Sequence, residues 1–210
     1  MTLPRSIVSW VLFHAFLIAS WEASAAISLT EKEINALARG EMVVRPMDEA
    51  AKKGMIAGVS FVVVNAPAEV VWRAFNDLSA WPAIFYNTLD ARQLSIRGET
   101  REIKLRLGNK YIGLDFFATL VTNHAQLELS YSLDAKRTPT VDESKGWIRL
   151  IPQPGGRTLV VFSAFAKIPF GGIIALMGDE LLRLIEYRLL SVPRRLKDWV
   201  ESPSGEKYRP

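Results

Sequence analysis

The sequence predicts an α+β domain that consists of an antiparallel sheet followed by a long C-terminal helix. Between residues 89 and 167, short segments with an apolar residue at every second position follow one another closely, which is typical of half-buried strands. Over residues 174–199, apolar residues then recur at steps of three and four, which predicts an amphipathic helix. Because the strand-like segments are joined by short turns, we expect a curved sheet with meander connectivity.

Length and composition limit what the protein can be. At 210 residues the chain has room for one domain and an extension. It contains no cysteine, which excludes disulfides, thiolate metal sites and cysteine nucleophiles. The formal charge is +4, and basic and acidic residues are mixed along the chain. This mildly basic balance is compatible with contact to an anionic membrane surface and does not require nucleic acid as a partner. We expect a monomer.

Residues 1–25 are predicted to be an export signal. Arg5 provides a positive start, residues 7–19 form an apolar core, and residues 23–25 are small, as a cleavage site requires. The apolar core has the length of a signal core and is short for a membrane span. We therefore expect a periplasmic or secreted protein, and the alternative is an uncleaved N-terminal membrane anchor.

The rest of the chain is predicted to form an extension, one domain and a tail. Residues 26–53 are interpreted as a helical extension, with Thr30 and Glu33 in a capping-box pattern and a β-like stretch from Met42 to Arg45. The main domain covers residues 54–201. Residues 202–210 are polar and are predicted to be disordered.

The domain is predicted to open with a strand, a helix and a small aromatic helix. The β-branched run Val59–Val64 predicts the strand, and Pro67 fits the start of the helix because its missing N–H is not needed there. This helix should end near Asp77, and a short second helix should cover Leu78–Tyr86. The later strands are predicted at residues 89–96, 102–107, 111–121, 126–133, 146–151 and 159–167. Pro193 should kink or split the C-terminal helix.

The run NAPAEVVWRAFNDLSAWPAIF, residues 65–85, resembles the opening of the START-like, helix-grip superfamily of SRPBCC proteins. That superfamily includes polyketide cyclases and aromatases, coenzyme-Q-binding proteins and lipid-transfer START domains. The resemblance extends over roughly residues 54–201. It implies that a sheet of about seven strands wraps around the long C-terminal helix, with two short helices after the first strand and a hydrophobic cavity between sheet and helix.

The resemblance also implies a set of cavity residues. The apolar candidates are Trp81, Phe85, Leu105, Leu107, Phe116, Leu129, Tyr131, Trp147, Phe162, Met177, Leu181 and Ile185. Their alternative role is to fill an ordinary core, because apolar periodicity does not distinguish a filled core from a cavity wall. Trp81 and Phe85 would lie at the cavity mouth or cap the sheet. The candidates for polar contacts with a ligand are Arg92, Tyr111 and Asp115, each of which could equally be a strand-surface or rim residue.

The sequence offers no catalytic constellation. His124 is the only histidine after the predicted signal, so a histidine-rich metal site is excluded, and it is interpreted as an exposed turn residue rather than a general base. The nucleophile elbow GxSxG and the phosphate loops of nucleotide-binding proteins are absent. The sequence therefore indicates neither a metal nor a cofactor.

Three functions remain open. The first is an exported, non-catalytic protein that holds or transfers a lipid, an isoprenoid or a similar hydrophobic molecule, with transient contact to a membrane surface. The second is a cyclase or aromatase type of enzyme that uses the same cavity. The third is an envelope interaction protein with a filled core and no ligand. A cavity too small for a ligand would favour the third function.

Overall fold

The computed structural model describes residues 28–47, 55–138, 141–167 and 183–209. The chain divides into two compact units, Met1–Ile34 and Asn35–Pro210, and the second unit holds the sheet. The predicted export signal lies outside the described residues. Helix α2 (Glu31–Ala38) begins at the predicted capping box, where the backbone amide of Thr30 donates a hydrogen bond to Glu33 Oε2 at 2.7 Å.

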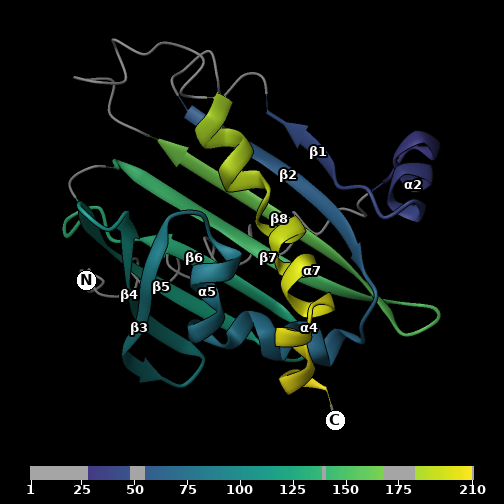
Figure 1. Cartoon of the computed structure of the whole chain (residues 1–210). Helices are drawn as coiled ribbons and strands as arrows, with labels where there is room; N and C mark the ends of the chain where they lie inside the picture. Colours follow the sequence, from purple (N-terminus) through teal and green to yellow (C-terminus); the bar gives the residue numbers. More distant parts are fainter. Residues whose placement is uncertain (1–27, 48–54, 139–140, 168–182, 210) are drawn as a thin grey trace, which may run out of the picture. The chain divides into compact units, whose positions relative to one another are not determined.

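The sheet has eight antiparallel strands in the order β1-β2-β8-β7-β6-β5-β4-β3 (Figure 1). The strands are β1 (Val43–Pro46), β2 (Met55–Val64), β3 (Thr88–Arg97), β4 (Thr100–Gly108), β5 (Gly113–Asn123), β6 (Glu128–Leu133), β7 (Glu143–Gln153) and β8 (Arg157–Lys167). The predicted meander is present from β3 to β8, and β8 then pairs with β2. The additional strand is β1, which was predicted as a β-like part of the extension and pairs with β2 at the edge of the sheet.

Three short helices connect β2 to β3. Helix α4 (Ala68–Asn76) follows Pro67. Pro67 occupies the N-cap and not the first helical position, where it was predicted. The 3₁₀-helix η2 (Leu78–Ala80) and helix α5 (Trp81–Ile84) form the predicted small aromatic segment. The indole of Trp81 donates a hydrogen bond to the carbonyl oxygen of Phe75 at 2.8 Å, which fixes α5 against the end of α4.

The C-terminal helix is split, as Pro193 predicts. Residues 183–190 are helical, Ser191 forms a turn, and α7 (Val192–Glu201) begins immediately before Pro193. Proline fits the first turn of α7 because it has no amide hydrogen to donate to the preceding turn. The first part of the predicted helix, residues 174–182, lies outside the described residues.

The core lies between the helices and one face of the sheet. Figure 1 shows α4, α5 and α7 on the same side, and α7 packs over β2 and β8 while α4 packs over β7 and β8. The largest side chains that are almost completely buried there include Phe61, Ile84, Ile103, Leu120, Leu129, Ile148, Phe162 and Leu196. Within the part of the chain that the structure describes, no helix is long and apolar enough to span a membrane.

The prediction of a disordered tail is wrong for residues 203–208. These residues form the 3₁₀-helix η3 (Pro203–Tyr208), and Tyr208 is buried. The Tyr208 hydroxyl donates a hydrogen bond to Asp77 Oδ2 at 2.6 Å, and Lys207 Nζ donates to the same oxygen at 2.9 Å. The polar composition of the tail gave no indication of this contact, because Asp77 lies far away in the sequence.

Replacing Asp77 with asparagine is expected to destabilise the protein by about 2 kcal/mol at neutral pH, because hydrogen bonds to a charged group are lost. Burial raises the pKa of Asp77, but hydrogen bonds from Ser79, Tyr208 and Lys207 outweigh it and hold this pKa well below its ordinary value of 3.8. Since the folded pKa is the lower one, the stabilisation is complete above about pH 4 and is lost as the pH falls further. Urea unfolding at several pH values measures both effects.

The matched control for this prediction is Asp198→Asn. Asp198 lies 3.7 Å from Arg194 and its side chain is 62% exposed, so this pair should contribute little to the free energy of unfolding. If the difference between wild type and Asp77→Asn stays constant from neutral pH down to pH 3, the ionised Asp77 is not what holds η3 in place.

Candidate ligand-binding cavity

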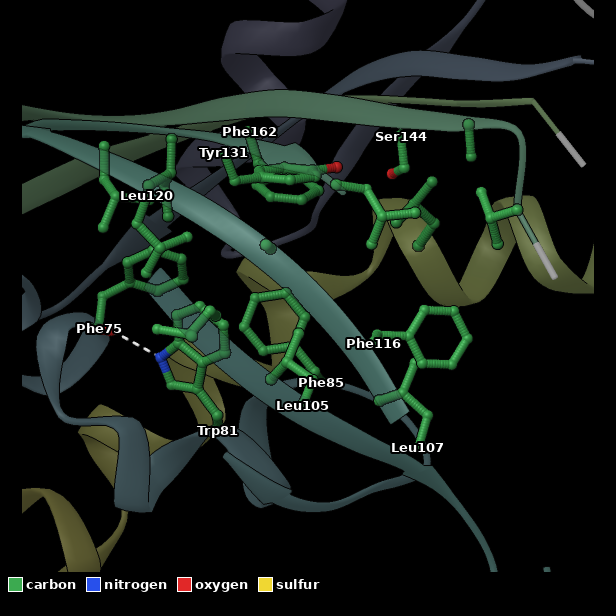
Figure 2. Close-up of a pocket in the computed structure, with 18 of the residues that line it drawn as sticks. Phe75, Trp81, Phe85, Leu105, Leu107, Phe116, Leu120, Tyr131, Ser144 and Phe162 are labelled. Carbon is green, nitrogen blue, oxygen red and sulfur yellow. Dashed lines mark hydrogen bonds between the residues drawn. The ribbon is translucent and has the colours of Figure 1, made fainter. Parts of the chain in front are cut away.

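A cavity of about 310 Å³ lies between the inner face of the sheet and the helices (Figure 2). This volume is at the lower end of the range of small-molecule sites in proteins. Nearly all of the atoms that face the cavity are carbon. The described residues that line it are Phe75, Trp81, Phe85, Ile103, Leu105, Leu107, Phe116, Ala118, Leu120, Leu129, Tyr131, Leu133, Val141, Ser144, Ile148, Phe162, Ala166, Ile185 and Leu189.

The strands supply one wall because their side chains alternate between the two faces of the sheet. On β4 the odd-numbered residues from Ile103 to Leu107 point inward, and on β5 the even-numbered residues from Phe116 to Leu120 do so. Of these residues, Leu105, Leu107 and Phe116 were predicted as cavity residues. Residues on the other face of β4 and β5 form ion pairs outside the cavity, such as Lys104 with Asp115.

Three aromatic rings from α4, α5 and the residue after α5 close one end of the cavity. The ring centroids of Trp81 and Phe85 lie 4.6 Å apart, and those of Phe75 and Trp81 lie 5.8 Å apart. Tilted rings at these distances attract one another beyond the effect of burying their area. This end of the cavity is therefore a packed aromatic cluster (Figure 2).

Of the twelve predicted cavity residues, the structure places most on the wall and one on the opposite face of the sheet. Those on the wall are Trp81, Phe85, Leu105, Leu107, Phe116, Leu129, Tyr131, Phe162 and Ile185. Met177 and Leu181 lie outside the described residues. Trp147 does not line the cavity, because β7 turns its even-numbered residues inward, and its ring lies instead 5.6 Å from the guanidinium carbon of Arg149.

The three predicted polar contacts are wrong as cavity residues. Arg92 pairs with Asp90, and its side chain is 75% exposed. Tyr111 is 81% exposed in the turn between β4 and β5. Asp115 pairs with Lys104 at 2.7 Å on the outer face of β5. Each has the polar or aromatic character that a ligand contact needs, but Arg92 and Asp115 lie on the outer face of the sheet and Tyr111 lies in an exposed turn.

The polar side chains that do lie at the cavity are Tyr131 and Ser144, and their hydroxyls point toward one another in Figure 2. Burial raises the pKa of Tyr131 to about 12, and the Ser144 hydroxyl counteracts this in part. The ring of Tyr131 borders the cavity, but its hydroxyl oxygen is buried and forms no full hydrogen bond among the described residues. Tyr131 is therefore neutral at physiological pH.

Gly146 makes room for the ring of Tyr131. The two residues are paired across β6 and β7. A Cβ atom on Gly146 would lie 2.7 Å from Tyr131 Cε1 and 2.1 Å from the carbonyl oxygen of Ser163. Ser144 and Gly146 were not predicted to belong to the site, although small residues at alternate positions of β7 are a signal for an inner face that accommodates a large neighbour.

A second hollow of about 390 Å³ adjoins the cavity and forms its mouth. The two hollows share Phe85, Leu105, Leu107, Phe116, Ile185 and Leu189. The mouth adds the polar residues Tyr86, Asn87, Thr88 and Arg188. The cavity thus leads from a carbon-lined interior to a mouth with polar groups and one positive charge.

Comparison with known proteins identifies the fold by structure rather than by sequence. No protein-family model matches the chain, and no curated protein does. A crystal structure of the ZhuI aromatase/cyclase from Streptomyces sp. R1128 has a TM-score of 0.59 and 18% identity, over 72% of this chain and 98% of that one. A STAR-related lipid transfer protein from Xanthomonas axonopodis has a TM-score of 0.58 and 13% identity, over 77% of this chain and 93% of that one. A START superfamily protein from Mycobacterium smegmatis has a TM-score of 0.52 and 14% identity, over 76% of this chain and 97% of that one.

The chain has the START-like helix-grip fold. In this START-like domain the sheet and the helices enclose the cavity as the fold predicts. At these identities the comparison establishes the fold alone, because lipid-transfer proteins and aromatase/cyclases share it.

The described wall of the START-like cavity holds no residue that is suited to general acid–base chemistry near neutral pH. His124 lies elsewhere, in the turn after β5, where its Nδ1 accepts a hydrogen bond from the indole of Trp72 at 3.3 Å. The two rings meet edge to face with their centroids 5.7 Å apart. Among the described residues, no group of three or more histidine, aspartate or glutamate side chains could hold a metal ion.

Proposed function

We propose that this protein holds or transfers a hydrophobic molecule in its cavity without changing it chemically. The observation that carries the proposal is the carbon-lined cavity of about 310 Å³, which has a polar mouth. Empty apolar space of this size is costly in a protein interior, because the surrounding side chains lose packing contacts. A bound apolar molecule would restore those contacts.

An aromatase/cyclase activity is the second candidate, since three of the similar structures carry that name. Such an enzyme needs a group that moves protons near neutral pH. The polar candidate on the described wall is Tyr131, and its pKa of about 12 keeps it protonated and a poor general base. This observation favours a carrier over an enzyme.

We also propose that the protein acts outside the cytoplasm, on the basis of the signal pattern in residues 1–25. A carrier is useful there because an insoluble molecule must cross an aqueous compartment. Fractionating the cells and sequencing the N-terminus of the recovered protein would test this. Recovery of the intact N-terminus in the membrane fraction would favour the uncleaved anchor.

Native mass spectrometry with lipid extraction tests the carrier function. The protein should be purified from its own cells without detergent, and we expect one apolar molecule bound per chain. A protein that is empty, and that also fails to take up a fluorescent fatty acid or isoprenoid probe, would overturn the proposal. Conversion of a bound polyketide-type substrate would favour the cyclase.

A further inference from the structure

The mouth of the cavity indicates which class of hydrophobic molecule the protein holds, and this inference rests on the proposed carrier function. Arg188 contributes the single charged side chain among the described residues that line the mouth. It belongs to the helical residues 183–190, one turn after the cavity residue Ile185. The charge thus lies directly beside the apolar path into the cavity.

Arg188 has no acidic partner in the part of the chain that the structure describes. Among the described residues no carboxylate forms an ion pair with it, and its guanidinium carbon lies 5.7 Å from the centroid of the Tyr86 ring. The guanidinium of Arg195 stacks on the same ring at 4.3 Å and donates hydrogen bonds to the carbonyl oxygens of Ala83 and Ile84. Two guanidinium groups therefore flank Tyr86, and both use neutral groups as partners.

The interior of the cavity cannot accept a charged group. Nearly every atom that faces it is carbon, and no described wall residue is basic. Moving an ionised group into such surroundings without a partner is strongly unfavourable. The charged end of any amphiphile must therefore remain at the mouth.

The mouth offers further donors beside the guanidinium. Asn87 and Thr88 line it, and the Thr88 hydroxyl is buried without a hydrogen-bond partner among the described residues. Thr88 itself is only 6% exposed. Because the Thr88 hydroxyl is closed off from the mouth, the accessible additional donors are those of Tyr86 and Asn87.

We propose that the ligand is a single-chain amphiphile with an anionic head, whose hydrocarbon chain fills the cavity and whose carboxylate or phosphate pairs with Arg188 at the mouth. The planar guanidinium fork matches both anions in a two-point contact. The cavity volume, at the lower end of the range of small-molecule sites, favours one chain over two.

This proposal is tested with four probes that have hydrocarbon chains of the same length and different head groups: palmitate, hexadecyl phosphate, hexadecanol and hexadecyltrimethylammonium. Affinities are measured by displacement of a fluorescent fatty acid from delipidated protein. We expect the two anions to bind best and the cation worst. Arg188→Gln should weaken the better anion about 10- to 100-fold, as the loss of a charge-assisted hydrogen bond predicts, and should change hexadecanol binding by less than about twofold. The ratio of palmitate to hexadecyl phosphate distinguishes the two head groups.

The matched control is Arg194→Gln, which removes an exposed guanidinium from α7 that pairs with Asp198 and does not line the mouth. It should change the affinity for none of the probes, and Arg188→Lys should retain part of the preference for anions. If hexadecanol binds as tightly as palmitate and Arg188→Gln weakens neither, the anionic head is wrong and the carrier function stands. If no probe binds to the wild type and the protein purified from its own cells is also empty, the carrier function itself is overturned.

Discussion

Ala118→Phe is expected to weaken binding of a fluorescent fatty acid by tenfold or more, because the new ring fills the space that the ligand needs. Ala118 lies on β5, is 5% exposed and faces the cavity between Phe116 and Leu120. In a packed core this enlargement would cost about 1 to 3 kcal/mol of stability. Here the ring has empty space to occupy, so the free energy of unfolding should fall by less or even rise. Probe titration and urea unfolding measure the two effects.

Val121→Phe is the control for Ala118→Phe. Val121 lies on the same strand but on its outer face and is 45% exposed. The same substitution at this position leaves the cavity unchanged, and probe affinity should therefore match that of the wild type. If Ala118→Phe is folded and still binds the probe as tightly as Val121→Phe does, then the ligand binds elsewhere.

The sheet and the helices could be predicted because their signals are local. On β4, alternating apolar residues indicated both the strand and its inner face, and the structure uses these residues in the cavity wall. Pro67 and Pro193 indicated where helices begin, since a proline cannot donate a backbone hydrogen bond. The structure places α4 and α7 at these two prolines.

The polar part of the site could not be predicted, because it depends on which face of each strand points inward. Shifting a strand by one residue exchanges its two faces. Trp147 was predicted to line the cavity, but its neighbour Ile148 is the residue that points into it. Arg188 was not predicted as a site residue, because its place at the mouth, beside residues of β4 and β5, depends on tertiary packing that no local pattern indicates.

The contact between η3 and Asp77 could not be predicted for a similar reason. Residues 203–208 are mostly polar, and their helix is held by Tyr208, which packs against residues from the start of the domain. Sequence composition describes the average behaviour of a segment. It contains no information about a single distant partner.

Gly146→Ala is expected to destabilise the protein by about 3 kcal/mol, at the upper end of what overpacking costs. The added methyl group would lie 2.1 Å from the carbonyl oxygen of Ser163, which is backbone on the neighbouring strand β8 and cannot move without disturbing the pairing of β7 and β8. It would also displace the Tyr131 ring from the cavity wall. For a chain of this size the expected fall in Tm is roughly 6 to 12 °C.

Gly113→Ala is the matched control, since Gly113 is also a strand glycine and pairs with Gly108. The atoms nearest to a Cβ there belong to the side chain of Arg106, whose Nε would lie at 2.6 Å, and this exposed side chain can turn away. Its Tm should therefore change little.

The displaced ring of Tyr131 adds a second expectation for Gly146→Ala: probe affinity should fall even at temperatures where the variant is fully folded. If Gly146→Ala lowers the Tm without changing probe affinity, the glycine is needed only for the packing of β7 against β8, and the position of Tyr131 does not affect ligand binding.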